Sequence, residues 1–328
     1  MWPPETLRAA VAARVRPAEP RPDAVTVARA VAEAGGEAVR AIVFFGSRKT
    51  KARPDAYSAY DLFVVVSAYT PFYRSLRDHG RLRHRPSLGA ALNAWLPPNQ
   101  VSLPVTLADG TRVLGKCAVL SDTALQRGTS PLRQDHFMAG RLFQPTELLY
   151  RADAAAEDAV LDALVSAHAL TYEWVRPWLP ARFDVADYCR TLLRVSYAGE
   201  IRPEPEGRAE ALWRAQEDYL RPVYSVLLEA LRERGELATP APGVYALTRP
   251  AHPLARLRSR LYFQWSLVRA TARWAKYVVT FEDWLEFLLR KARRHSGQTI
   301  ELTERERRMP LIFLWPRVID YLRHKDKP

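Results

Sequence analysis

Residues 41–66 read AIVFFGSRKTKARPDAYSAYDLFVVV, and this stretch decides the fold that the sequence predicts. Ile42–Phe45 is a short apolar run typical of a buried strand, and it stops at a Gly-Ser pair. A second strand-like run, Leu62–Val66, is entered through Asp61. The pattern predicts two buried strands, with polar residues where the first strand ends and the second begins.

The polar residues at this junction suit a triphosphate. Gly46 and Ser47 offer backbone N–H groups and a hydroxyl to phosphate oxygens, and Arg48 and Lys49 add positive charge. Asp61 is placed to hold a divalent cation, Mg²⁺, against the same phosphates. The arrangement resembles the nucleotidyltransferase signature, in which Gly-Ser is followed by Asp-x-Asp on the next strand.

One of the two acids of that signature is missing. Ala59 occupies the first acidic position before Asp61, and counting from Asp61 instead puts Phe63 in the second position. The second metal ligand therefore stays open, with Asp55 and Asp122 as alternatives. An ordinary strand-turn-strand with a solvated acid at its edge is the simpler alternative for the whole stretch.

Length and composition favour a large intracellular globular protein. The chain has 328 residues, of which 48% are apolar and 26% charged. Two cysteines, Cys117 and Cys189, make a disulfide framework or a cysteine-rich zinc site improbable. No apolar run approaches the roughly 20 residues that span a bilayer, and no secretory segment is present.

Positive charge is concentrated near the C-terminus. The net charge is +13, and residues 251–328 contribute +9 of it, from 17 Lys and Arg against 8 Asp and Glu. A localised basic field indicates a polyanionic partner, either a nucleic acid or an acidic membrane surface.

The rest of the chain divides into segments with clear patterns. Asp109-Gly110 lies between alternating apolar residues and predicts a hairpin, with Lys116 on its return strand. A Pro- and Gly-rich stretch at 238–253 predicts a linker or extended arm. Helical spacing recurs in residues 24–40, 156–178, 184–195, 209–233 and most of 254–328.

Four further blocks, in order, resemble one family. They are LGKCAVLSDTALQ (114–126), FMAGRLFQPTELL (137–149), YCRTLLRVSYAGEIR (188–202) and EDYLRPVYSVLLE (217–229). The family is the mitochondrial-type phosphatidate cytidylyltransferases, the translocator assembly and maintenance proteins, with their bacterial relatives. The resemblance covers about residues 40–230, and this family too has a lone acid before its second strand.

The sequence predicts an α+β fold in three parts, of which the resemblance implies the first two. Residues 1–150 would form a nucleotidyltransferase-fold domain, a mixed sheet with flanking helices. Residues 151–250 would form a helical, winged-helix-like domain, and residues 251–328 a basic, amphipathic helical region. The implied reaction joins CTP and phosphatidate into CDP-diacylglycerol and pyrophosphate with Mg²⁺, in the cytoplasm at the inner face of the membrane, with no nucleic acid as partner.

Several site residues follow from the blocks. Lys116 alternates with apolar neighbours and would point at a phosphate. Arg141 would bind CTP or phosphatidate, or else close a domain interface. Ser196 and Tyr197 would contribute to substrate binding.

The end of the SYAGEIR block carries two more candidates. Arg202 would take the lipid phosphate, and Glu200 would assist the metal or the base. The alternative is a helix stop with a structural Glu–Arg pair. Gln144 stands where the family has Lys, and Glu200 replaces Asp, which leaves room for a different lipid acceptor.

The pattern of the tail predicts a membrane-surface element over residues 254–294. Its basic side chains would meet anionic headgroups, with tryptophan and tyrosine at the borders. The alternatives are a core helix with a solvated basic face, or a nucleic-acid-binding protein built on a degenerate nucleotidyltransferase domain. The basic residues recur at helical spacing at Arg256, Arg260, Arg269, Arg273 and Lys276, and the apolar ones at Leu257, Leu261, Trp265 and Val268.

Overall fold

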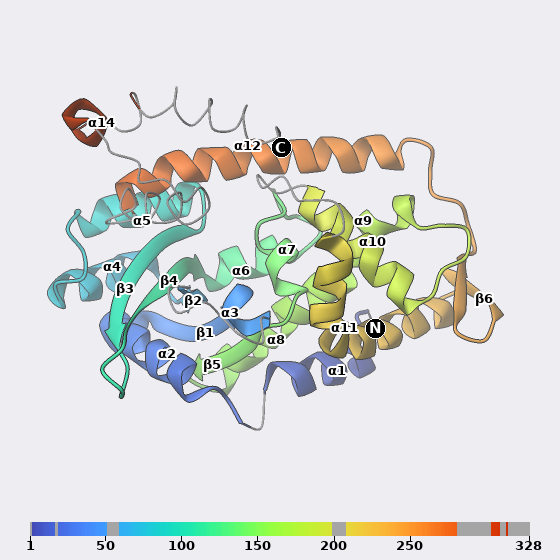
Figure 1. Ribbon diagram of the computed structural model, residues 1–328, viewed down its shortest axis with the longest axis horizontal. Coiled ribbons are helices and arrows are strands. Elements are labelled where there is room, and N and C mark those ends of the chain that lie inside the picture. Colours follow the sequence, from blue (N-terminus) through green and yellow to red (C-terminus); the bar gives the residue numbers. More distant parts are fainter. Residues whose placement is uncertain are drawn as a thin grey trace.

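A five-stranded mixed sheet lies at the centre of the N-terminal half of the protein (Figure 1). The structure is a computed structural model, and it describes residues 2–16, 19–50, 59–198, 208–280, 303–308 and 313. The strand order is β3-β4-β2-β1-β5. β2 and β4 run parallel, and the other neighbours run antiparallel. The strands are β1 (Val39–Phe45), β2 (Tyr60–Val66), β3 (Asn99–Thr106), β4 (Arg112–Ser121) and β5 (Glu147–Arg151).

The predicted strands around residues 42–45 and 62–66 are confirmed, and helices cover both faces of the sheet. Ile42 and Phe44 point into one apolar cluster, whereas Ala41 and Val43 point into another. Strands buried on both faces read as continuous apolar runs, which is the pattern of this sequence. One face of the sheet packs on α2 (Pro22–Gly35) and α4 (Tyr69–Asp78), and α5 (Pro86–Trp95) packs against α4. The other face packs on four helices, α1 (Glu5–Val15), α6 (Asp122–Gly128), α7 (Ala139–Leu142) and α8 (Ala154–Ala169).

The hairpin predicted at Asp109-Gly110 joins β3 to β4. Gly110 has a φ of +81°, a conformation that favours glycine. The Asp109 carboxylate accepts a hydrogen bond of 2.9 Å from the backbone N–H of Thr111. The turn sets the register that places Lys116 opposite Ser102 on β3. The parallel pairing of β4 with β2 places Lys116 beside Asp61.

The predicted helices after residue 150 are also confirmed. They are α8, α9 (Thr171–Val175), the 3-10 turn η2 (Arg176–Trp178), α10 (Val185–Ala198) and α11 (Arg208–Glu233). Of the two alternatives for residues 238–253, a linker or an extended arm, the linker is wrong over the first part, because β6 (Leu237–Ala241) and β7 (Val244–Leu247) form an antiparallel hairpin. A winged-helix arrangement of this region stays a prediction. The short elements η1 (Gly36–Ala38), α3 (Ser47–Thr50) and α14 (Glu304–Arg308) complete the description.

The helical region shares its apolar core with the sheet. Val43 and Phe63 from the sheet belong to the same buried cluster as Leu192 of α10 and Leu228 of α11. The first helix, α1, packs against α8 and α11 rather than against its neighbours in sequence. The sheet and the helices therefore support each other's position.

The long helix α12 (Ala255–Thr280) lies across both halves of the protein (Figure 1). Near its start, Arg256 donates a hydrogen bond of 2.8 Å to the carbonyl of Pro177 in η2. Near its end, Arg273 donates one of 2.9 Å to the carbonyl of Pro97, just before β3. Among the described residues, no helix has both the length and the apolar character needed to cross a bilayer.

Candidate functional site

Asp61 and Lys116 lie side by side at one edge of the sheet surface. The strand register pairs Asp61 with Phe45, the last residue of β1, and with Lys116 on β4. The Lys116 ammonium is 3.6 Å from Asp61 Oδ1, and the two side chains are 29% and 26% exposed. The pair is thus held by the sheet but remains accessible from solvent.

Gly46 brings the backbone against the Asp61 carboxylate. Its φ is +85°, in the left-handed region that favours glycine. A Cβ at this position would lie 2.6 Å from Asp61 Oδ2, which is closer than atoms approach. Gly46, Asp61 and Lys116 therefore form one compact group, as the sequence predicts, and we call it the β1–β2 site.

The other residues predicted at this junction have different partners. The Arg48 guanidinium lies 4.2 Å from the ring centre of Tyr60, whose side chain is buried on the face of the sheet opposite to Asp61. Lys49 forms an ion pair of 2.7 Å with Glu147, which is buried at the start of β5. The structure does not bring these two cations to Asp61. The side chain of Ser47 lies outside the described residues.

Asp61 is a single carboxylate, and this limits how a metal can bind. Within the described ranges no cluster of three or more His, Cys, Asp or Glu side chains could hold an ion. Asp122 directly follows Ser121, the last residue of β4, which pairs with Val66; Ser121 lies about 17 Å along the strands from the level of Asp61, and Asp122 lies beyond it. Asp55 is not among the described residues. Mg²⁺ commonly takes one or two protein carboxylates and completes its shell with waters and substrate phosphates, and Asp61 fits that role.

Arg141 reaches the same face of the sheet through aromatic contacts. Its guanidinium lies 4.0 Å from the ring centre of Phe137 and donates a hydrogen bond of 2.9 Å to the Phe137 carbonyl. The Phe137 ring meets Phe63 edge-on, and Phe63 stacks on Phe45 with centres 4.4 Å apart. Since Phe63 and Asp61 are two residues apart on β2, they share a face of the sheet.

Ser196 and Tyr197 join the end of α10 to the segment that contains α7. Ser196 is 1% exposed and shares a hydrogen bond of 2.9 Å with His136 Nε2. The Tyr197 hydroxyl donates to Gln144 Oε1 over 3.1 Å. A Cβ on Gly140 would lie 2.6 Å from the His136 ring, which explains the glycine in the AGRL block. The two blocks meet in space, and these contacts give Ser196 and Tyr197 a structural role.

His136 was not predicted from the sequence, although it directly precedes the FMAGRL block. Its ring is enclosed by Trp174, Tyr262 and Phe263. Burial holds the pKa of His136 well below its ordinary value, and the charges of Arg133 and Arg141 act in the same direction. The imidazole therefore stays neutral and serves as a packing element between α9, α10 and α12.

A second charged group, which we call the α12 anchor, was also missed. Asp135 accepts hydrogen bonds from Arg269, at 2.7 Å, and from Arg273, whose side chain is only 2% exposed. Lys276 donates to the carbonyls of Leu96 and Pro98. The expectation that Arg269 and Arg273 form an outward basic face is therefore wrong.

Burial shifts the ionisation of the α12 anchor. Burial by itself raises the pKa of Asp135, but Arg273 and Arg269 outweigh it, and the net result is a lowered pKa. Burial lowers the pKa of Lys276 to about 7, and the neighbouring Arg273 and Arg269 contribute to the same direction. These charges fasten the C-terminal half of α12 to the 92–98 segment and to residue 135.

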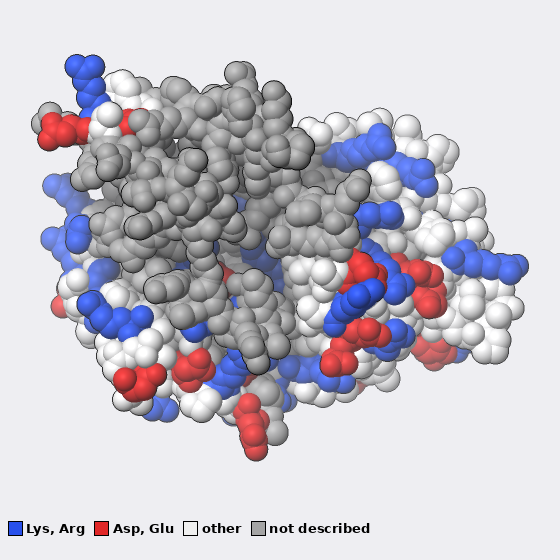
Figure 2. Space-filling model, in the orientation of Figure 1, with Lys and Arg blue, Asp and Glu red and all other residues white. Residues whose placement is uncertain are grey.

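The apolar face of α12 points outward instead. Figure 2 shows basic side chains along the first half of this helix. Between them, five large apolar residues on one side of the helix are each more than half exposed: Leu254, Leu257, Leu261, Trp265 and Val268.

The last predicted residues, Glu200 and Arg202, lie outside the described residues. Comparison with family models and with curated proteins gives no match for this chain.

Proposed function

We propose that this protein is a CDP-diacylglycerol synthase, which transfers CMP from CTP to phosphatidate and releases pyrophosphate. The observation that carries the proposal is the β1–β2 site, in which a glycine with positive φ, a carboxylate and a lysine meet at the ends of two neighbouring strands. The resemblance of the blocks at 114–126, 137–149 and 188–202 to the phosphatidate cytidylyltransferases supplies the substrates.

Each residue of the β1–β2 site has a task in this reaction. Gly46 has no side chain, so a phosphate can approach the backbone closely. Lys116 supplies a compact positive charge to a phosphate oxygen. Asp61 would hold Mg²⁺ together with the triphosphate, and a bound Mg²⁺ would offset negative charge on the phosphates.

The lipid phosphate would then attack the α-phosphate of CTP, and the bond to pyrophosphate would break. The protein needs no covalent intermediate, because positioning and charge stabilisation suffice for such a transfer. Arg141 is the described cation best placed to orient a substrate, since its guanidinium rests on Phe137 over the same face as Asp61. Arg202 and Glu200 remain proposals for the lipid phosphate and for the metal or base.

Contact with the inner face of the membrane is proposed for α12. The support is its exposed apolar face, which includes a tryptophan and lies among basic side chains. Insertion of the apolar face, more than pairing of Arg269 and Arg273 with headgroups, would hold the protein at an anionic bilayer.

One assay tests the reaction. Purified full-length protein is incubated with phosphatidate in detergent, Mg²⁺ and each of the four labelled ribonucleoside triphosphates, and pyrophosphate release is measured. Release that needs both CTP and phosphatidate supports the proposal. Release with another acceptor would change the lipid assignment, and salt-sensitive binding of DNA or RNA without any turnover would favour a nucleic-acid-binding protein.

A further inference from the structure

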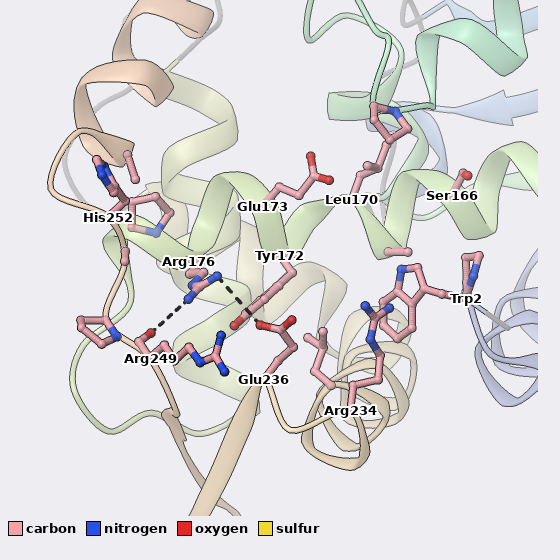
Figure 3. A pocket seen from close by; sticks show the side chains of 18 residues that line it. Trp2, Ser166, Leu170, Tyr172, Glu173, Arg176, Arg234, Glu236, Arg249 and His252 are labelled. Carbon is pink, nitrogen blue, oxygen red and sulfur yellow. Dashed lines mark hydrogen bonds and ion pairs between the residues drawn. The ribbon is translucent and has the colours of Figure 1, made fainter.

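A cavity lies on the helical side of the protein, and none of the β1–β2 site residues lines it. It has a volume of about 820 Å³ and is lined by the N-terminal residues 2–3, by α8 to η2, by the turn after α11 and by residues 249–255 (Figure 3). A cavity of this size accommodates a nucleotide-sized molecule.

The residues that line this cavity carry an excess of positive charge. Three arginines line it, Arg176, Arg234 and Arg249, against two acids, Glu173 and Glu236. Glu173 lies 3.6 Å from Arg133, and Glu236 is 3.9 Å from Arg176. Within the described part of the chain, Arg234 and Arg249 form no ion pair. An anion entering the cavity would therefore find positive charge that no described acid neutralises.

Two buried polar atoms of the cavity also lack partners. The Tyr172 side chain is 7% exposed, and its hydroxyl has no hydrogen-bond partner among the described residues. The same holds for the Nε of Arg176, whose Nη2 donates to the carbonyl of Arg249 over 3.1 Å. Figure 3 shows the Tyr172 ring pointing toward Glu236 and Arg249, beside Arg176. The Arg176 guanidinium lies 5.8 Å from the centre of the Tyr172 ring, so the two donors are neighbours in the cavity lining and could serve one ligand.

The donors select the chemistry of that ligand. Burial raises the pKa of Tyr172 to about 12, so the phenol keeps its proton and donates at neutral pH. Arg176 offers a further N–H, and arginine matches the geometry of phosphate oxygens. At the other end of the cavity the Arg234 guanidinium lies 4.2 Å from the ring centre of Trp2, which provides a flat apolar surface.

We propose that this cavity binds a phosphate-bearing small molecule, with its phosphate held by Arg176, Arg249 and the Tyr172 hydroxyl. The same chemistry is found in a free phosphate ester and in the headgroup of an acidic lipid. The cavity shares no lining residue with the β1–β2 site, so the two can be tested independently.

Isothermal titration calorimetry with the full-length protein tests this. The probes are inorganic phosphate, CMP, glycerol 3-phosphate and dihexanoyl phosphatidate below its micelle concentration. The Lys116→Ala variant weakens phosphate binding at the β1–β2 site, so binding that keeps its wild-type affinity in this variant reports on the cavity. We expect at least one probe to bind this variant as it binds the wild type.

Two substitutions in that Lys116→Ala background locate the site. Arg176→Gln should weaken binding about tenfold or more, because it removes a charged donor. Tyr172→Phe should also weaken binding but should not lower the free energy of unfolding, since the hydroxyl has no partner to lose. Arg214→Gln, at an exposed arginine of α11, is the matched control and should change neither quantity.

The outcomes separate clearly. Binding of dihexanoyl phosphatidate alone identifies a lipid headgroup as the ligand, and equal binding of inorganic phosphate or CMP identifies a free phosphate. The proposal is overturned if no probe binds the Lys116→Ala variant with a Kd below about 1 mM. It is equally overturned if Arg176→Gln and Tyr172→Phe both bind every probe as their parent does.

Discussion

The β1–β2 site and the α12 anchor contain similar residues but differ in how they meet solvent. In the first, Asp61 and Lys116 are 3.6 Å apart and about a quarter exposed. In the second, Asp135 binds Arg269 and Arg273, and Arg273 is closed off almost completely. An open charge pair can exchange its partner for a ligand, whereas a closed one cannot without unfolding. The difference predicts opposite responses to substitution.

The largest effect is expected for Asp61→Asn. It removes the charge proposed to hold Mg²⁺, so lipid-dependent pyrophosphate release should fall about a thousandfold. The free energy of unfolding should change by less than about 1 kcal/mol, because Asp61 and Lys116 form a solvent-accessible pair. Both quantities are measured on the same preparation, by turnover and by urea denaturation.

Asp122→Asn is the control for Asp61, because Asp122 lies at the opposite end of the parallel strands. It should retain turnover within a few-fold of wild type. An equal loss of turnover in both variants would show that Asp61 has no specific role in the reaction.

For the α12 anchor we expect the reverse. Asp135→Ala leaves two arginines without their carboxylate and should lower the free energy of unfolding by about 3 kcal/mol. Asp158→Ala breaks an exposed ion pair with Arg8 and should cost about 0–1 kcal/mol. If urea denaturation gives similar losses for both variants, Asp135 is not the anchor.

At acidic pH the free energy of unfolding should fall, because the folded protein contains histidines that are buried in the neutral form. Burial lowers the pKa of His168 to about 3, and its side chain is fully buried. The unfolded chain takes up this proton near pH 6.5, but the folded protein does not, so stability is complete above pH 6.5 and falls as the pH drops toward 3. At pH 4.5 the loss from His168 alone should be about 3 kcal/mol.

Urea denaturation of the wild type and of His168→Asn across this pH range checks the assignment. The variant should show a shallower decline below pH 6.5. His79→Asn, at an exposed histidine of α4's C-terminal end, should keep the slope of the wild type.

Two lysine substitutions in the N-terminal half compare an accessible ion pair with a buried one. Lys116→Ala should raise the KM for CTP between about tenfold and a hundredfold, because it removes one charged phosphate contact. Lys49→Ala should mainly destabilise the protein, since it leaves buried Glu147 without its cation. A change of base preference in Lys116→Ala, with triphosphate affinity intact, would contradict the phosphate contact.

The smallest effect concerns the exposed face of α12. The double variant Leu261→Gln, Trp265→Gln should reduce binding to phosphatidate-containing vesicles by about tenfold or more. It should leave unfolding and turnover on a short-chain, soluble phosphatidate almost unchanged, because both side chains are more than half exposed. Loss of stability in this variant would show that another part of the protein covers this face.

Local patterns predicted much of the sheet. The apolar runs at 42–45 and 62–66 and the Asp-Gly turn at 109–110 each carry their signal within a few residues, and all three are confirmed. Lys116 was expected to point at a phosphate, but the parallel pairing of β2 with β4 that places it beside Asp61 was not predicted. The hairpin of β6 and β7 was missed, because its Pro- and Gly-rich sequence is also the composition of a linker.

Long-range pairing could not be predicted from one sequence. Arg269 and Arg273 have the same helical spacing as a solvated basic face, and the acid that draws them inward lies 134 and 138 residues earlier. Arg48 and Lys49 likewise follow the Gly-Ser pair, yet one lies over Tyr60 and the other binds Glu147. In each case the partner comes from a strand or segment that only the fold brings near.

The position of α12 across both halves also fixes an order of events during synthesis. The ribosome must add 134 residues after Asp135 before Arg269 exists, which takes on the order of 10 s at usual elongation rates. Until then the Asp135 carboxylate and the carbonyls at 96–98 have no α12 side chains to bind. Before α12 is synthesised, the Asp135 carboxylate can only be hydrated. A chain that ends after β7 would therefore lack the ion pairs and hydrogen bonds that α12 makes with Asp135 and with the carbonyls of Leu96 and Pro98.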